Sequence, residues 1–255
     1  MYHTVIFLPL YNGLIGIMDL LPWADVGVAV IIFTVIVKLV LFPLSKSSLL
    51  TQVRMKEIEP EANKIKAEYA NDRQTQTLKV MALYKERGIK PFSGVLLLLI
   101  QLPILLALIS VFYKIIPSIH PEFLYSFVSA PDITNKIEFL GLIDLTQKSL
   151  ILSLITGIVQ FFQLHYSLAA HKPAGVQVKA NNSNVKGALN PDMMASMTKQ
   201  MKIFLPILAF ASTYWLIPAQ FPQAASVIAI YWTVSTLFTL GQELYIRKKH
   251  FGKTV

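Results

Sequence analysis

Five long apolar runs decide what this chain can fold into. A helix needs roughly 20 predominantly apolar residues to cross a bilayer, with a range of about 17–25. Runs of that length predict an all-α polytopic membrane protein with a core of five transmembrane helices. Only the turn 220–223 separates the last two runs, so we expect these two spans to form a tight helical hairpin. The runs cover residues 25–44, 92–113, 149–170, 203–220 and 223–244.

A single cation interrupts the first run. Lys38 is the only charged residue between Val26 and Pro43. A charge at membrane depth is costly unless water, a partner or a substrate meets it, so an ionisable residue there indicates a functional site.

The composition agrees with a membrane protein. Charged residues make up 15% of the chain, against about 25% in soluble proteins, and the mean hydropathy is +0.55. The chain has no cysteine, which excludes disulfides and thiolate chemistry.

Lysine and arginine are distributed asymmetrically among the connecting segments. The segments 45–91, 171–202 and 245–255 carry 19 of them, whereas the segments 1–24, 114–148 and 220–223 carry three. Because basic loops stay on the cytoplasmic side, we expect an outside N-terminus and a cytoplasmic C-terminus. Anionic lipid surfaces then account for the net charge of +9 without DNA as a partner. The basic tail 245–255 is compatible with ribosome contact or with solvated anchoring.

The segments outside the five runs predict further elements. Residues 1–24 have no basic n-region or cleavage site and are interrupted by polar and small residues, which favours an interfacial helix on the outer surface over an extra span. Residues 45–91 predict two amphipathic helices in a cytoplasmic hairpin, bent at Pro60 and ended by Gly88. The stretch 171–202 is a turn-rich cytoplasmic loop that ends in a methionine stripe, Met193, Met194, Met197 and Met201.

Polar side chains within the runs favour the predicted cytoplasmic halves. Besides Lys38 they include the amides Gln101, Gln160, Gln163 and Gln242. Lys38 shares a helical face with Thr34 and Ser45. Amides and cations need partners or water at this depth, so the pattern indicates a hydrated cavity that is open to the cytoplasm. The alternative is hydrogen bonding between helices together with a lysine that snorkels to the interface.

No enzyme motif is present in the sequence, and no cofactor or metal is expected. Apart from Asp25, the first residue of the first run, Glu243 at the end of the last run is the one acidic residue within the five runs. That argues against a proton- or sodium-coupled transporter, which usually uses intramembrane carboxylates. A small channel or carrier that uses the polar cavity remains the second hypothesis.

The chain resembles YidC/Oxa-type membrane protein insertases over essentially its whole length. The order and spacing of the shared stretches carry the resemblance. They are Val35-Ile-Val-Lys-Leu-Val-Leu-Phe-Pro-Leu44, Met55-Lys-Glu-Ile-Glu-Pro-Glu61, Met81-Ala-Leu-Tyr-Lys-Glu-Arg-Gly88, Lys90-Pro-Phe-Ser-Gly94, Leu99-Ile-Gln-Leu-Pro-Ile104 and Tyr231-Trp-Thr-Val-Ser-Thr-Leu-Phe238 with Gln242.

This resemblance implies a non-enzymatic insertase of the bacterial plasma (inner) membrane. It implies a five-helix core with a hydrophilic groove in the inner leaflet, and nascent membrane proteins as clients. The ribosome and the Sec translocon are further partners to consider. The groove residues implied are Lys38, Thr34, Gln101, Gln160, Gln163, Thr236 and Gln242.

Two features distinguish this chain within the resemblance. Lys38 stands where most bacterial members carry arginine, which keeps the charge but loses the planar five-donor guanidinium. About 24 residues precede the first run, so we expect the short form without a large periplasmic domain.

Overall fold

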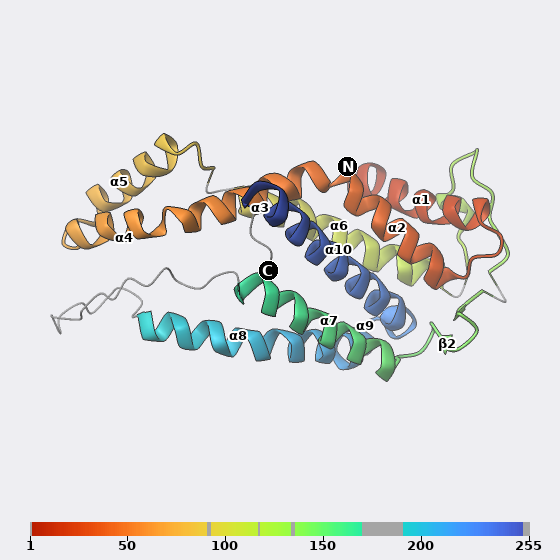
Figure 1. Cartoon of the computed structure of the whole chain (residues 1–255). Coiled ribbons are helices and arrows are strands. Elements are labelled where there is room, and N and C mark those ends of the chain that lie inside the picture. The colour runs from red at the N-terminus through yellow and green to blue at the C-terminus, as the bar shows by residue number, and fades with distance from the viewer. Residues whose placement is uncertain (1, 91–92, 117, 134–135, 170–190, 252–255) are drawn as a thin grey trace.

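The computed structural model of the chain describes residues 2–90, 93–116, 118–133, 136–169 and 191–251. Within these ranges most residues are helical, and the strand content is one two-stranded sheet. Long helices form an elongated bundle with a helical hairpin projecting from one end and irregular loops at the other (Figure 1). We call these the helical-hairpin end and the loop end. The predicted all-α polytopic membrane fold is confirmed.

Four helical segments of the described chain are long and apolar enough to cross a membrane on their own, and a bent helix pair can make a fifth span. A shorter apolar helix, Leu99–Ile115, belongs to α6 (Ser93–Ile115). The N-terminal segment passes the same test, so its length alone fits the rival extra span as well as an interfacial helix. The four segments are His3–Leu20, Leu150–Ser167, Gln200–Gln220 and Pro222–Lys249.

The first predicted span is not one straight helix. Helix α2 (Val26–Val40) begins where the Asp25 carboxylate accepts a 2.8 Å hydrogen bond from the Val28 N–H. After Leu41, helix α3 (Phe42–Glu57) continues in a direction bent by 63°. Pro43 lies in the first turn of α3, where its missing N–H costs no helical hydrogen bond. The bend therefore falls inside the expected range 25–44, three residues beyond Lys38.

The helical hairpin follows the predicted segment 45–91. Helix α4 (Glu59–Glu68) begins with Pro60 in its first turn, so the expected bend becomes a break at Ile58. Helix α5 (Arg73–Glu86) starts with Asp72 as the N-cap, and hydrogen bonds from the Thr75 side chain and N–H hold the pKa of Asp72 below its ordinary value. The chain leaves α5 through Gly88, whose φ of 63° fits the predicted glycine cap.

The remaining helices complete the bundle. Helix α7 (Leu150–Ala169) packs on α8 (Pro191–Ala211) and on α10 (Ala225–Phe251), and α10 also packs on α2. A π-helical turn, η3 (Ser212–Leu216), and the short α9 (Ile217–Gln220) extend α8 to the turn η4 (Pro222–Ala224), as the predicted tight hairpin requires.

Two boundaries differ from the sequence expectation. Helix α8 begins at Pro191, earlier than the expected start of the fourth span at 203. Helix α10 runs to Phe251, into the segment expected as a tail. Residues 171–190 and the side chains of Met193, Met194 and Met197 lie outside what is described, and Met201 is 46% exposed.

The apolar core lies toward the loop end. Its buried side chains come from the first half of α2, the second half of α6 and the first turns of α10, together with α1 (Leu8–Leu20). Fully buried examples are Leu14, Leu108, Phe112 and Ile228. Toward the helical-hairpin end a separate small cluster joins Ile58, Ala62, Leu83 and Ile89.

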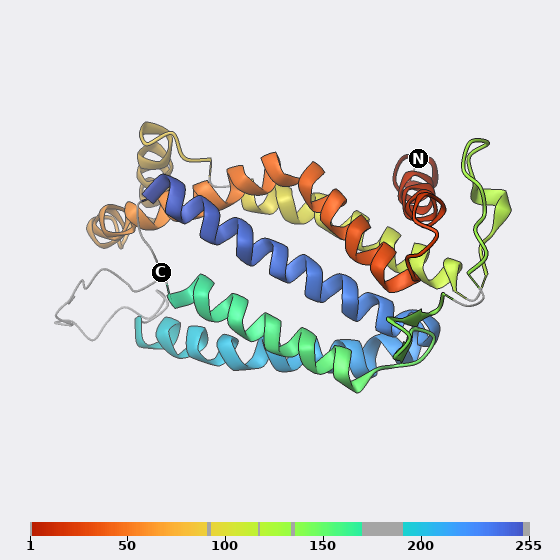
Figure 2. The same cartoon turned by 45° about the vertical axis from the view of Figure 1, so that its right-hand side comes forward.

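The N-terminal helices cross the end of the bundle. Figure 2 views α1 nearly end-on while α7 and α10 extend lengthwise, so α1 does not run parallel to them. It continues the π-helical η1 (His3–Phe7) and packs against α2 and α6. The buried face of α1 makes it part of the core, and the interfacial helix expected for residues 1–24 stays a prediction.

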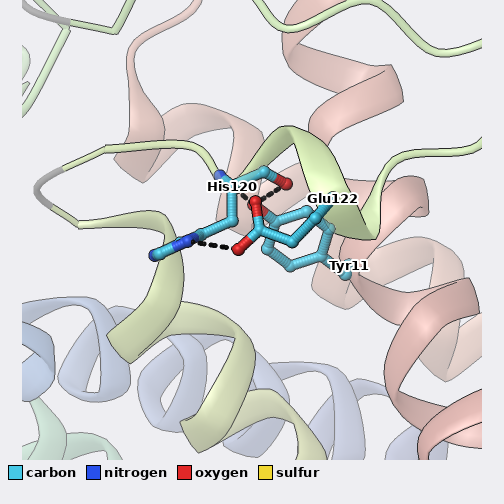
Figure 3. Close-up of polar contacts among 3 residues, drawn as sticks. All are labelled: Tyr11, His120 and Glu122. Carbon is cyan, nitrogen blue, oxygen red and sulfur yellow. Dashed lines mark hydrogen bonds and ion pairs between the residues drawn. The ribbon is translucent and has the colours of Figure 1, made fainter.

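Polar side chains of α1 hold the connection between α6 and α7 in place. The Tyr11 hydroxyl accepts a 2.7 Å hydrogen bond from the His120 N–H, and the His120 ring contacts Glu122 at 3.0 Å (Figure 3). Asn12 donates to the Phe123 carbonyl and accepts from the Tyr125 N–H. The pKa of Glu122 is lowered by its own N–H and by His120. Asn12 therefore anchors the loop, rather than merely interrupting an apolar helix.

Candidate functional site

Four of the predicted groove residues, Lys38, Gln101, Gln160 and Gln242, take part in hydrogen bonds between α10 and other helices, and these bonds fall at two levels along α10. At the first level α6 and α7 contact Tyr231 and Trp232, and at the second α2 and α3 contact Thr239 and Gln242. At 1.5 Å per residue the two levels are about 12 Å apart. We call these four residues the polar strip of α10.

Lys38 lies at the second level. It occupies the last turn of α2, where the partial negative charge of the helix terminus favours a cation. Its ammonium Nζ donates to the Thr239 hydroxyl at 3.3 Å, and that hydroxyl in turn donates to the Ser235 carbonyl. The side chain is half-buried. None of the ion pairs found among the described residues includes Lys38.

A hydroxyl–amide pair lies beside it. The Gln242 side-chain N–H donates to the Ser45 hydroxyl at 3.1 Å, which joins the first turn of α3 to α10 across the bend. Gln242 is only 6% exposed, so this partner satisfies an amide that would otherwise be costly to bury. Ser45 faces the same helix as Lys38, as their spacing of seven residues predicts.

The first level consists of amides and aromatic side chains. Gln101 of α6 donates to the Tyr231 hydroxyl at 3.2 Å. On α7, Gln160 donates to the Gln163 carbonyl oxygen at 3.0 Å and accepts a 3.3 Å hydrogen bond from the Trp232 indole N–H. All three amides are half-buried, so part of their hydrogen-bonding capacity faces away from these partners.

Two of the predicted residues occupy less open positions. Thr34 is 1% exposed, and its hydroxyl donates to the Val30 carbonyl of its own helix at 2.6 Å. Thr236 lies between the two levels of α10 and is 9% exposed. The seven predicted residues thus do not form one cluster. Lys38, Gln101 and Gln160 hydrogen-bond to α10 at separate points along it.

Sequence reasoning missed the partners on α10 and an ion pair beyond them. Tyr231, Trp232 and Thr239 carried no charge or amide that would single them out. Glu243 and Arg247 form a largely buried ion pair at the helical-hairpin end of α10. Their spacing of four residues was a usable signal, but the segment after 244 was expected to be a tail.

A surface pocket at the opposite, loop end is lined by Met18, Asp19, Pro22, Pro131, Asp132 and Lys136.

The fold and the polar strip define the class: an all-α, multi-pass membrane protein with polar side chains paired between its spans. Residues 18–253 match the model of the family described as 60Kd inner membrane protein, so the chain belongs to that family. The resemblance seen in the shared sequence stretches is thereby confirmed.

Relatives of two lengths match the chain. A Clostridium tetani protein named membrane protein insertase YidC is 31% identical over 89% of this chain and 84% of its own length. A Fusobacterium nucleatum protein of the same name is 29% identical over 88% and 86%. One from Dinoroseobacter shibae is 27% identical over 89% of this chain, which spans only 34% of that longer relative.

Proposed function

We propose that this protein inserts integral membrane proteins into the bilayer and helps them fold. Family membership and the printed name of its relatives support this activity. The observation that carries the proposal is the pairing of Lys38 with a hydroxyl, at the end of a helix and half-exposed. A cation that is held without a carboxylate keeps its charge available for an acidic group of another molecule.

The proposed groove lies in the cytoplasmic leaflet, along the polar strip of α10. Lys38 supplies the charge, and the amides at the two levels offer hydrogen bonds to a polar segment that passes them. The apolar core toward the loop end closes the groove on its outer side. The seven proposed groove residues are Lys38, Thr34, Gln101, Gln160, Gln163, Thr236 and Gln242.

The mechanism makes and breaks no covalent bond. The hydrophilic tail of a client enters the groove, where the amides replace part of its hydration. This shortens the apolar barrier that the tail must cross. Lys38 attracts acidic residues of that tail. The apolar segment of the client then moves into lipid, driven by its own burial and by the membrane potential acting on the tail.

The orientation that this mechanism needs places α4 and α5 in the cytoplasm and residues 118–133 outside. The 19-to-three distribution of lysine and arginine supports it. We expect Thr77→Cys and Ser129→Cys, both at exposed positions in a cysteine-free chain, to react with a membrane-impermeant maleimide from opposite sides. Ser129→Cys should react in intact cells and Thr77→Cys only after permeabilisation. Reaction of both in intact cells would refute the orientation.

A channel or carrier is the second candidate, because a polar strip between spans could also conduct a solute. Purified protein in liposomes separates the two functions. We expect insertion of a single-span client, measured by protease protection of its translocated tail, without a rise in ion or small-solute flux over empty liposomes. Solute flux without client insertion would favour the carrier.

The ribosome, the Sec translocon and anionic lipids are proposed partners, and the basic end of α10 is their proposed contact.

A further inference from the structure

The connection between α6 and α7 contains a β-hairpin with an unusual turn. Strand β1 (Glu138–Phe139) pairs antiparallel with β2 (Ile143–Asp144). Leu140 and Gly141 both have positive φ, 54° and 66°, and the Leu142 N–H donates to the Phe139 carbonyl at 3.0 Å. Turns of this kind favour asparagine or glycine at both central positions. A leucine in the left-handed region has a strained backbone, which persists only where the surrounding structure holds it in place.

The strained turn is fixed to the start of α2. One carboxylate oxygen of Asp25 caps α2, and the other accepts a 3.0 Å hydrogen bond from the Leu140 N–H. The Val26 N–H donates to the Lys136 carbonyl. Phe139 covers Gly27 so closely that a Cβ there would lie 2.3 Å from its ring. The turn therefore has a defined position relative to the first span.

Large apolar side chains are exposed around this anchor. Leu140 is 62% and Leu142 84% exposed at the tip of the β-hairpin. Leu20 and Trp23, in the segment that leads to Asp25, are 79% and 73% exposed. Two leucines held outward in a strained turn, next to further exposed apolar side chains, indicate a surface that contacts another apolar phase.

Charge divides the β-hairpin along its length. The tip, residues 139–143, has no charged side chain. At the base of the β-hairpin, Glu138 and Asp144 lie directly opposite each other on the two strands. Hydrogen bonding from Thr146 holds the pKa of Asp144 below its ordinary value, which keeps it ionised at neutral pH. Like charges directly opposite repel each other, and Glu138 is exposed. The base therefore belongs in solvent and the tip in the apolar phase.

The exposed apolar surface of the helices continues to this position. Helix α7 begins six residues after Asp144, with Leu150 and Ile151 exposed by 49% and 61%. Figures 1 and 2 place the β-hairpin at the same end of the bundle as the turn between α9 and α10. Tryptophan favours the membrane–water interface. Trp23, in the neighbouring segment, is exposed and is therefore free to lie at that interface. The tip thus lies where a bilayer surface would meet the spans.

We propose that the Leu140–Leu142 tip is a membrane anchor that inserts between the lipid headgroups and the upper acyl chains of the outer leaflet. Its attachment through Asp25 sets the depth of α2. Helix α2 has 15 residues, about 22 Å, and is shorter than the roughly 30 Å hydrocarbon core. If the start of α2 is held at the outer interface, the end of α2 that carries Lys38 lies inside the cytoplasmic half of the bilayer. The proposal of a membrane anchor does not depend on the proposed insertase function. The functional importance of the depth at which it holds Lys38 does rest on that function.

Site-directed fluorescence tests the anchor directly. The cysteine-free chain allows the single variants Leu142→Cys, Ser129→Cys and Leu154→Cys, each labelled with the polarity-sensitive fluorophore NBD, in phosphatidylethanolamine–phosphatidylglycerol vesicles. Ser129 is an exposed position in the same connection, and Leu154 is exposed on α7. We expect the probe at Leu142→Cys to be blue-shifted, quenched by lipids with nitroxides at the headgroup or upper acyl chain, and several-fold less quenched by iodide than the probe at Ser129→Cys.

Two outcomes would overturn the anchor. Iodide quenching at Leu142→Cys equal to that at Ser129→Cys would place the tip in water. A blue-shifted probe that neither iodide nor lipid nitroxides quench would place it against protein, either another copy or a partner.

The consequence for depth has a separate test. Leu140→Asn with Leu142→Ser removes the apolar tip and keeps a turn that asparagine favours, so the fold should be retained. A probe at Ile36→Cys, exposed on α2, should then change its quenching profile with nitroxide depth. An unchanged profile would refute control of α2 by the tip. Because no client takes part, this result stands or falls separately from insertase activity.

Discussion

Replacing Lys38 with glutamate is expected to abolish insertion of clients whose translocated tails are acidic. Lys38→Ala should reduce it on the order of tenfold, because a single charge attraction at a partly hydrated site contributes about 1–4 kcal/mol, and each 1.4 kcal/mol or so is a factor of ten. Glutamate replaces that attraction with repulsion. The measurement compares matched single-span clients, with acidic and with neutral tails, at equal levels of the variant.

Three controls separate electrostatic capture from a structural role. Lys38→Arg should retain activity, since it keeps the charge. Thr239→Val removes the hydroxyl that Lys38 contacts but keeps the charge, and should also insert acidic clients. Insertion of neutral-tail clients should be affected less by Lys38→Ala. The Lys38→Ala variant should fold, because removing a costly intramembrane cation does not destabilise the helix bundle. Equal insertion of acidic clients by wild type and Lys38→Ala would leave Lys38 as an interfacial anchor only.

The charge of Lys38 was visible in the sequence, but its partner was not. A cation within an apolar run is detectable without any contact information. Which hydroxyl receives it depends on the rotation of α10 against α2, and α10 is rich in serine and threonine. The same limit applies to Gln101 and Gln160, which meet a tyrosine and a tryptophan. Such rings occur in apolar cores as well as at membrane interfaces, so the residue type alone does not identify them as partners.

Backbone direction was harder to predict than helix existence. Pro43 marks a helix start or a kink, but its sequence position does not give the 63° between α2 and α3. Pro60 similarly predicts a disturbance, which the structure realises as a break before α4. The β-hairpin escaped prediction because leucine at 140 contradicts the turn chemistry that would reveal it. Such local conflicts tend to occur at functional sites.

Polar residues in apolar segments were interpreted too simply at the N-terminus. Asn12 was counted among the interruptions that weaken a span. In the structure it is 4% exposed and hydrogen-bonded to the backbone of residues 123 and 125. Its role depends on a loop more than 100 residues later in the chain, which no local pattern contains.

Glu243→Ala is expected to cause the largest loss of stability among the single variants considered. Glu243 and Arg247 are ion-paired, with side chains 7% and 13% exposed. Arg247 also donates to the Ser167 carbonyl near the end of α7 at 3.4 Å. Removing the carboxylate leaves a buried guanidinium with no counter-charge, and breaking a buried pair from one side costs about 3–5 kcal/mol. Arg247→Ala should cost a similar amount through the orphaned carboxylate.

The double variant Glu243→Leu with Arg247→Met tests this reasoning, because an apolar pair of similar volume is often as stable as the buried ion pair that it replaces. We expect thermal unfolding of the detergent-solubilised protein to rank wild type and the double variant close together, with both single variants well below. Lys248→Ala, at an exposed position of the same helix, should match wild type. If the two single losses simply add in the double variant, the pair does not act as a unit. If the double variant is stable but inserts clients poorly, the ion pair holds the ends of α7 and α10 in register, and with them the amides that face the proposed groove.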